Sequence, residues 1–114
     1  MIDWERVGEL HSEIGDVGFS EVLELFFDEV EMVIAQLGGA SRQLEDDLHF
    51  LKGSAWNLGF AAFGAICQDG ERRSAAGHSN EIDLPAVHEC YMTSKTEFMA
   101  RVGEFCRTRG SAVA

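Results

Sequence analysis

Apolar residues recur along this chain at intervals of three and four, which is the period of an amphipathic α-helix. No stretch alternates apolar and polar residues as a half-buried strand would. The pattern predicts helices over residues 3–14, 19–37, 41–58, 60–76 and 84–107, with a frayed tail over 109–114. We therefore expect an all-α fold, an antiparallel up-and-down four-helix bundle with a short additional N-terminal helix.

Residues that start and stop helices separate these segments. The pair Gly38 and Gly39 follows the second predicted helix, and Ser41 is a suitable N-cap for the third. Asp83 can cap the last helix, with Pro85 in its first turn. The connections are short, as in a bundle of antiparallel neighbours.

The third predicted helix shows which of its faces is buried. Its apolar stripe consists of Leu44, Leu48, Leu51, Ala55 and Leu58. At about 100° per residue, His49 lies roughly 150° from the centre of that stripe, so its imidazole should face solvent or a partner. Lys52, Gly53 and Trp56 follow His49 along the same surface, one and two turns on.

Length and charge narrow the possible classes of protein. With 114 residues, the chain should form a single domain over 1–114. Nine Lys and Arg against twenty Asp and Glu leave a net charge of −11, which is unsuited to nucleic acid or an anionic membrane surface. Charged residues interrupt every apolar run before it reaches membrane-spanning length. Three widely spaced cysteines without a CxxC pair or an N-terminal signal stretch favour reduced thiols and a cytoplasmic location.

Candidate chemistry centres on His49. An exposed imidazole is a nitrogen nucleophile that can accept a phosphoryl group. The ammonium group of Lys52, one turn away, would offset part of the added negative charge. Glycine inside a helix costs roughly 0.8–1.0 kcal/mol relative to alanine. Gly53 therefore indicates either a need for clearance beside the histidine or close packing of a neighbouring helix.

Other chemistries find little support. His11, His78 and His88 form no HxxxH or HExxH pattern, so we expect surface or loop histidines and no metal site. Ser54 lacks a nucleophile elbow, and no Gly-rich loop precedes a Lys-Ser/Thr pair, so neither a hydrolase nor a nucleotide site is indicated. Cys67 is expected to be a small core residue.

The stretch from His49 to Gly59 resembles the signature of histidine-containing phosphotransfer (HPt) domains, His-x-Leu-Lys-Gly-Ser-x-x-x-Leu-Gly. The matching residues are His49, Leu51, Lys52, Gly53, Ser54, Leu58 and Gly59. These domains often carry a cysteine 18 positions and an acidic or amide residue 22 positions after the histidine, and here those residues are Cys67 and Glu71. Three residues depart from the family pattern. Leu48 occupies a position where many members have alanine, Gly70 replaces a usual leucine, and Ala75 lies where some members have a basic residue.

The resemblance implies roles for individual residues. His49 would be phosphorylated, through the ring nitrogen farther from the backbone, Lys52 would orient or neutralise the phosphoryl group, and Gly53 would give access. Gln68 and Glu71 are candidates for a supporting role. Glu71 could hold a neighbouring side chain or water, or it could repel the phosphoryl group. Because a dianion must be held beside Lys52, we expect the acidic residues to lie away from His49.

The implied function is that of a shuttle in a multistep phosphorelay, without ATP chemistry of its own. Its partners would be response-regulator receiver domains and a hybrid histidine kinase, and it would itself be a monomer. It would need no cofactor, because Mg²⁺ belongs to the receiver. Candidate docking residues are Trp56, Phe60, Leu25 and Met32. The last two could instead pack under Trp4 and Leu10.

Two other functions are also compatible with the sequence. The chain could be an adaptor that binds a receiver without accepting phosphate. It could also be the phosphorylated domain of a chemotaxis-type histidine kinase.

Overall fold

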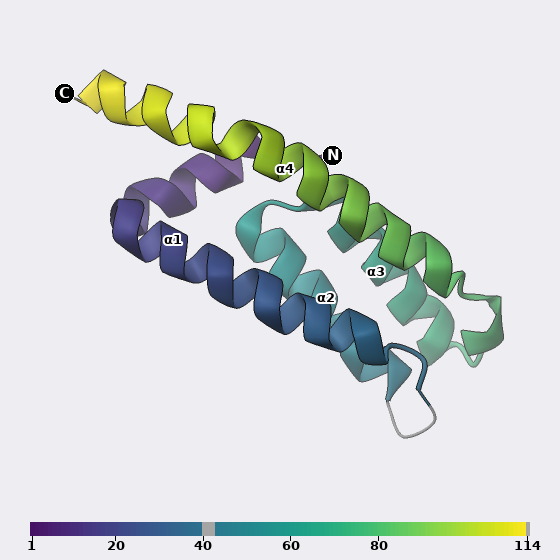
Figure 1. Cartoon of the computed structure of the whole chain (residues 1–114). Coiled ribbons are helices and arrows are strands. Elements are labelled where there is room, and N and C mark those ends of the chain that lie inside the picture. Colours follow the sequence, from purple (N-terminus) through teal and green to yellow (C-terminus); the bar gives the residue numbers. More distant parts are fainter. Residues whose placement is uncertain (40–42, 114) are drawn as a thin grey trace.

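The computed structural model describes residues 1–39 and 43–113, with side chains up to residue 107. Within these ranges the chain is all-helical and has no strand, which confirms the predicted class (Figure 1). Its elements are α1 (Trp4–Gln36), α2 (Leu44–Leu58), α3 (Ala61–Ala75), the short 3₁₀ helix η1 (Ser79–Glu81) and α4 (Leu84–Val113). No helix in the described part is long and apolar enough to cross a membrane.

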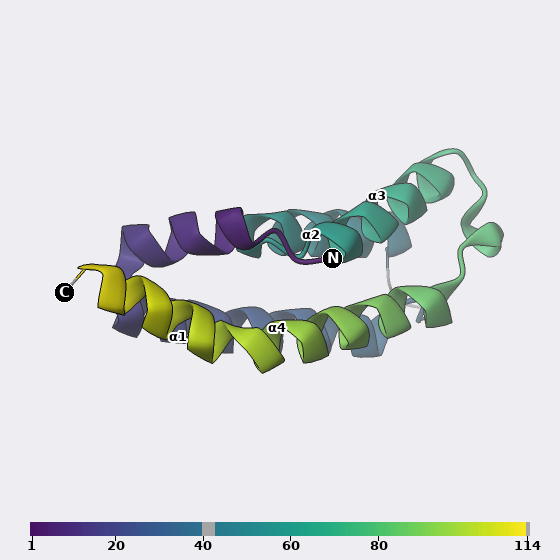
Figure 2. The ribbon, with the colours of Figure 1, turned by 90° about the horizontal axis from the view of Figure 1, so that it is seen from above.

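The helices form two layers, as Figure 2 shows from above. One layer holds α4 and the second part of α1, and the other holds the N-terminal part of α1 together with α2 and α3. The core between them is rich in aromatic rings. Phe60 lies at its centre, with ring centroids 5.1 Å from Phe26 and 5.3 Å from Phe98.

The two helices expected over 3–14 and 19–37 are joined in α1, and only Gly15 leaves the helical conformation, with φ 76° and ψ 177°. Residues that carry a Cβ rarely adopt this backbone conformation, so the break depends on glycine.

His11 makes its contacts across the break at Gly15. Its Nε2 lies 2.6 Å from Asp16 Oδ1, and its ring packs edge-on against Phe19. His11 is thus buried, and the surface position expected for it is wrong. Helical periodicity could not show contacts that form only where the chain folds back.

Two helix boundaries differ from the expectation. Helix α2 begins at Leu44, and the expected cap Ser41 lies outside the described residues. Helix α4 extends to Val113, beyond the predicted helix end at residue 107. A lone glycine such as Gly110 costs a helix only about 1 kcal/mol and need not end it, and no proline follows.

The buried face of α2 is the predicted one. Leu48, Leu51, Ala55 and Leu58 are buried, and Leu44 is half-buried. This confirms the helical phase from which His49 was placed on the outside.

Leu48 and Gly70 are in contact across α2 and α3. A Cβ added to Gly70 would lie 3.1 Å from Leu48 Cδ1 and 3.6 Å from Ile82 Cγ2. The large side chain of Leu48 therefore occupies space that a side chain at position 70 would need. Two of the three departures from the HPt pattern thus form a single packing contact, in which the larger side chain lies on α2 instead of α3.

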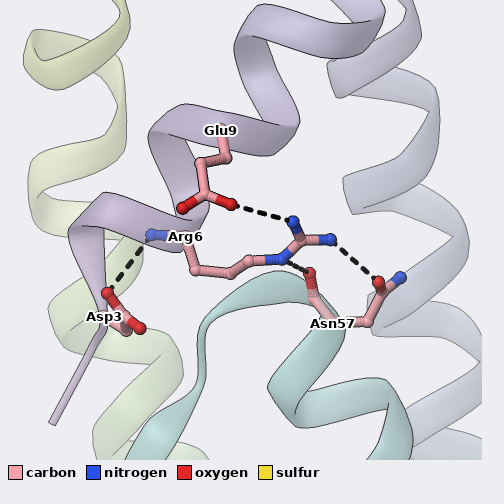
Figure 3. A network of polar contacts seen from close by, with 4 residues as sticks. All are labelled: Asp3, Arg6, Glu9 and Asn57. Carbon is pink, nitrogen blue, oxygen red and sulfur yellow. Dashed lines mark hydrogen bonds and ion pairs between the residues drawn. The ribbon is translucent and has the colours of Figure 1, made fainter.

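The N-terminal part of α1 is fastened to the end of α2 (Figure 3). The Arg6 guanidinium donates to the backbone oxygen of Asn57 at 2.9 Å and to its Oδ1 at 3.0 Å. Asp3 caps the helix by accepting from the Arg6 N–H. The Asp3 N–H in turn donates to the Gly59 carbonyl at 2.7 Å. A Cβ on Gly59 would lie 2.7 Å from the Asp3 carbonyl oxygen, so this approach needs glycine.

The same segment closes the core through Trp4. Its indole stacks on Phe98 with centroids 5.6 Å apart and also contacts Phe105 at 5.0 Å. The Arg101 guanidinium lies over the Trp4 ring at 5.2 Å. The N-terminal segment is therefore an integral part of the hydrophobic core.

Candidate functional site

His49 lies on the exposed face of α2, and 69% of its side chain is accessible. Its Nδ1 is 2.7 Å from Oε2 of Glu71, which reaches across from α3. One edge of the imidazole is thus held by the protein, while the ring as a whole remains open to solvent.

Lys52, one turn after His49, contacts the other oxygen of the same carboxylate. Its Nζ lies 2.6 Å from Glu71 Oε1, and both side chains are mostly buried. The ammonium group also lies 5.9 Å from the centroid of the Trp56 ring. Glu71 therefore links the imidazole and the ammonium group, and Lys52 is fixed from two sides.

The charge of Glu71 determines which ring nitrogen of the neutral His49 imidazole carries the proton. The hydrogen bond from Lys52, together with the contact to His49, holds the pKa of Glu71 below its ordinary value, although burial opposes this. An ionised carboxylate can only accept hydrogen bonds. In the neutral imidazole the proton must therefore sit on Nδ1, which leaves the lone pair on Nε2.

The expectation that acidic residues lie away from His49 is wrong for Glu71. That expectation considered only the charge of a phosphoryl group and not the need of Nδ1 for an acceptor. Of the two roles considered for Glu71, contact with neighbouring side chains is observed, because its carboxylate reaches both His49 and Lys52. Its negative charge is balanced by Lys52 in the same contact.

Gly53 leaves the surface beside His49 bare. A Cβ added there would meet no atom within 4 Å. The glycine is therefore not required by packing inside this chain, in agreement with a need for clearance on the outside.

Gly64 on α3, which the sequence analysis did not single out, supports the site through Trp56. A Cβ on Gly64 would lie 2.1 Å from Trp56 Nε1, so the indole packs directly on the α3 backbone. In the sequence, this contact with Trp56 is indicated only by a glycine on the inner face of a helix. Such glycines are too common to predict a particular contact.

A family model described as Hpt domain matches residues 21–96, about two thirds of the chain, and the matched region includes His49, Lys52, Gly53 and Glu71. The chain belongs to the Hpt domain family. Hpt domains carry out histidine phosphotransfer in phosphorelays and interact with receiver domains and histidine kinases. Comparisons with curated proteins and with solved structures gave no match.

Three of the four docking candidates of this Hpt domain are on its surface. Leu25 and Met32 on α1 are 58% and 60% exposed, so they do not pack under Trp4 and Leu10, and Trp56 is also exposed. Leu25 lines a groove of about 150 Å³ between α1 and α2. The surface role expected for Phe60 is wrong, because this residue is fully buried. Phe60 follows Gly59, whose left-handed conformation ends α2, so the helical phase could not predict its direction.

Phe50, next to His49, was missed and is exposed at the surface of the Hpt domain. Phe50 is not part of the apolar stripe of this helix, and no motif in the sequence pointed to it.

The remaining candidates lie outside the His49 contacts. Gln68 is half-buried on α3. It takes no part in the two contacts at the site, in which Glu71 binds His49 and Lys52. His78 and His88 are exposed as expected. Cys67 is a buried thiol whose pKa is raised to about 12 by burial. Among the described residues, no group of three or more acidic, histidine or cysteine side chains could hold a metal ion.

Proposed function

We propose that this Hpt domain is a shuttle in a multistep two-component phosphorelay. His49 accepts a phosphoryl group from the aspartyl phosphate of one receiver domain and passes it to an aspartate of another. One observation carries this proposal: an exposed imidazole whose Nδ1 faces an ionised carboxylate, so that the Nε2 lone pair is free.

The transfer follows from this arrangement. The Nε2 lone pair attacks phosphorus, an N–P bond forms, and the P–O bond to the receiver aspartate breaks, which leaves a free carboxylate on the receiver. The proton on Nδ1 stays in place, so the phosphorylated ring carries a positive charge. Glu71, which accepts from Nδ1, stabilises that charge. The return step reverses these changes on the second receiver.

Lys52 and Gly53 act on the incoming group in this proposal. The Lys52 ammonium lies within one turn of His49 and can offset part of the phosphoryl charge. Donor and acceptor atoms must approach nearly in line, and the bare surface at Gly53 leaves room for the receiver.

The wider setting belongs to the same proposal. The helices act as an antiparallel up-and-down bundle with the segment before Gly15 as an additional helix, and the course of the ribbon in Figure 1 supports this. Leu25, Met32 and Trp56 supply apolar docking contacts for the receiver. The receiver contributes Mg²⁺, a hybrid histidine kinase supplies the phosphate, and the relay operates in the cytoplasm without a cofactor or kinase activity in this chain.

The test is incubation with a receiver domain carrying labelled aspartyl phosphate. Label should reach the wild-type chain and His88→Gln, which alters an exposed histidine of α4, but not His49→Gln. The phosphate should be acid-labile and base-stable, as expected for phosphohistidine. Equal labelling of His49→Gln would refute the assignment. An adaptor that does not accept phosphate would bind the receiver without becoming labelled.

A further inference from the structure

None of the described helices lies against the outer face of α4, as Figures 1 and 2 show from two directions. For three turns this face carries no charged side chain, although a quarter of the chain is charged. Its exposed members are Met92, Thr93, Thr96, Met99, Ala100 and Gly103. The two methionines are 48% and 54% exposed. We call this set the α4 stripe. It is uncharged and carries two exposed methionines, and exposed apolar side chains grouped in this way are typical of a protein contact.

The α4 stripe is bounded by opposite charges. Glu89 precedes it and Arg107 follows it, 18 positions apart, which is five helical turns and hence the same face. Arg107 Nη1 lies 3.7 Å from the position of a Cβ on Gly103, so the guanidinium group reaches back to the end of the stripe. Among the described side chains, neither Glu89 nor Arg107 forms an ion pair.

This face is complementary to itself. The midpoint of Glu89 and Arg107 is position 98, and the midpoint of the stripe falls between positions 97 and 98. A two-fold axis at this point would place Glu89 of each copy opposite Arg107 of the other. It would also place Thr96 opposite Ala100, where small side chains permit close approach. The Thr96 hydroxyl already donates to the Met92 carbonyl at 2.9 Å, so it needs no partner from water.

We propose that the α4 stripe pairs in antiparallel orientation with the stripe of a second copy of this chain. A two-fold contact requires a surface that is complementary to itself, and the placement of Glu89 and Arg107 about the midpoint of the stripe meets this requirement. The absence of charge within the stripe also matters, because two copies of net charge −11 repel each other. This dimer replaces the monomer expected from the sequence.

The contact leaves both phosphotransfer sites open. His49 lies on α2, in the layer opposite α4, so two receivers can dock on a dimer at the same time (Figure 2). A contact made by one pair of helices is small. We therefore expect a dissociation constant of roughly 10 µM to 1 mM.

Sedimentation equilibrium of the full chain over this concentration range tests the proposal. The wild type should dimerise, and Met99→Glu should be monomeric throughout. Glu89→Arg and Arg107→Glu should each raise the dissociation constant about tenfold, since each reversal places like charges together twice per dimer. The double variant exchanges the two charges and should restore the wild-type constant. Met32→Glu, at a similarly exposed methionine of α1, is the control and should leave the constant unchanged.

Circular dichroism of each variant shows whether it is folded. A wild type that stays monomeric up to about 1 mM, or a Met99→Glu variant that still dimerises, would overturn the proposal. Single charge reversals without effect would do the same, as would failure of the double variant to regain dimerisation. None of these outcomes depends on phosphotransfer, so the self-association and the shuttle function are tested separately.

Discussion

The Glu71 carboxylate contacts both His49 and Lys52, and we expect phosphorylation of His49 to change these two contacts. Before transfer, Lys52 is bound to Glu71 Oε1. A phosphoryl dianion on His49 would compete for the same ammonium group, while the Nδ1 proton would still need the other carboxylate oxygen. Glu71 should therefore favour a reactive imidazole and at the same time limit how firmly the phosphoryl group is held.

Two substitutions at position 71 separate these effects. Glu71→Gln keeps an oxygen that can accept from His49 Nδ1 but cannot form an ion pair with Lys52. A phosphoryl dianion on a positively charged ring adds net negative charge beside Glu71, so removing the carboxylate charge and releasing Lys52 outweigh the weaker stabilisation of the ring. The equilibrium with a receiver should therefore shift toward the phosphorylated Hpt domain, by about two- to fivefold. Glu71→Ala removes both contacts, and transfer should slow by roughly 10- to 100-fold as the ring loses its orientation. Rates and end points of transfer from a labelled receiver measure both effects.

Tautomer populations give an independent check of this account. Nitrogen NMR of His49 should show the proton on Nδ1 in the wild type and a mixture of tautomers in Glu71→Ala. If Glu71→Ala transferred phosphate as fast as the wild type, the carboxylate would have no positioning role.

Acid should weaken the fold through carboxylates whose pKa is lowered in the folded chain. In Glu71 the main cause is the Lys52 hydrogen bond, and in Glu31 it is the hydrogen bond from Lys95, followed by that from Tyr91. A lowered pKa stabilises the folded state above the ordinary value of about 4.3, and this contribution disappears as the pH falls through the lower folded value. Urea unfolding at neutral and acidic pH should show this loss.

Variants assign the loss to these groups. Glu31→Gln should be less stable than wild type at neutral pH, by about 0.2–1 kcal/mol for an exposed pair, and should lose less stability on acidification. Glu21→Gln, at an exposed position of α1, is the matched control. Identical pH profiles for Glu31→Gln and wild type would contradict the assignment.

For the helices, sequence-based predictions were accurate where a regular helical period continues without a break. The buried stripe of α2 and the exposure of His49 follow from a period of 3.6 residues and were predicted correctly. Where a glycine changes the direction of the chain, the helical period no longer predicts which side chains are buried. Gly15 breaks α1, Gly59 turns Phe60 inward and Gly110 interrupts nothing, yet the sequence shows the same residue in all three places.

Contacts between helices were harder to predict than the helices themselves. The bond from His49 to Glu71 joins α2 and α3, so it depends on how the two helices pack and not on either one alone. The sequence could place Glu71 near His49 only by resemblance, and it left the role of Glu71 open. His11 was misplaced for the same reason, because its partners Asp16 and Phe19 lie beyond a break in the helix.

The contact between Leu48 and Gly70 predicts strong coupling between α2 and α3. Leu48→Ala should cost about 2–5 kcal/mol of unfolding free energy, because it leaves a cavity. Gly70→Leu should cost about 1–3 kcal/mol by overpacking against Leu48. In the double variant the new leucine can fill the space left at position 48. We expect a favourable coupling of about 0.5–3 kcal/mol in a double-mutant cycle measured by urea unfolding. Additive losses would show that the two positions do not share this space.

For the whole molecule, the segment before Gly15 matters more than its place outside the family match suggests. Leu10 on this segment is buried, whereas Ile14 four residues later is exposed. Leu10→Ala should therefore lower the unfolding free energy by about 2–5 kcal/mol. Ile14→Ala should change it by less than about 0.5 kcal/mol. Thermal and urea unfolding of the full chain measure both. Equal effects would mean that this segment is not packed into the core.

The Leu48–Gly70 contact also bears on how the sequence could have diverged from its relatives. Starting from alanine and leucine at these positions, enlarging position 48 first would produce a clash, whereas shrinking position 70 first would leave only a cavity to be filled later. The second order is the more accessible one, so relatives that have alanine and glycine at these two positions are the expected intermediates. Relatives with two leucines should be rare, and the two positions should change together in lineages related to this one.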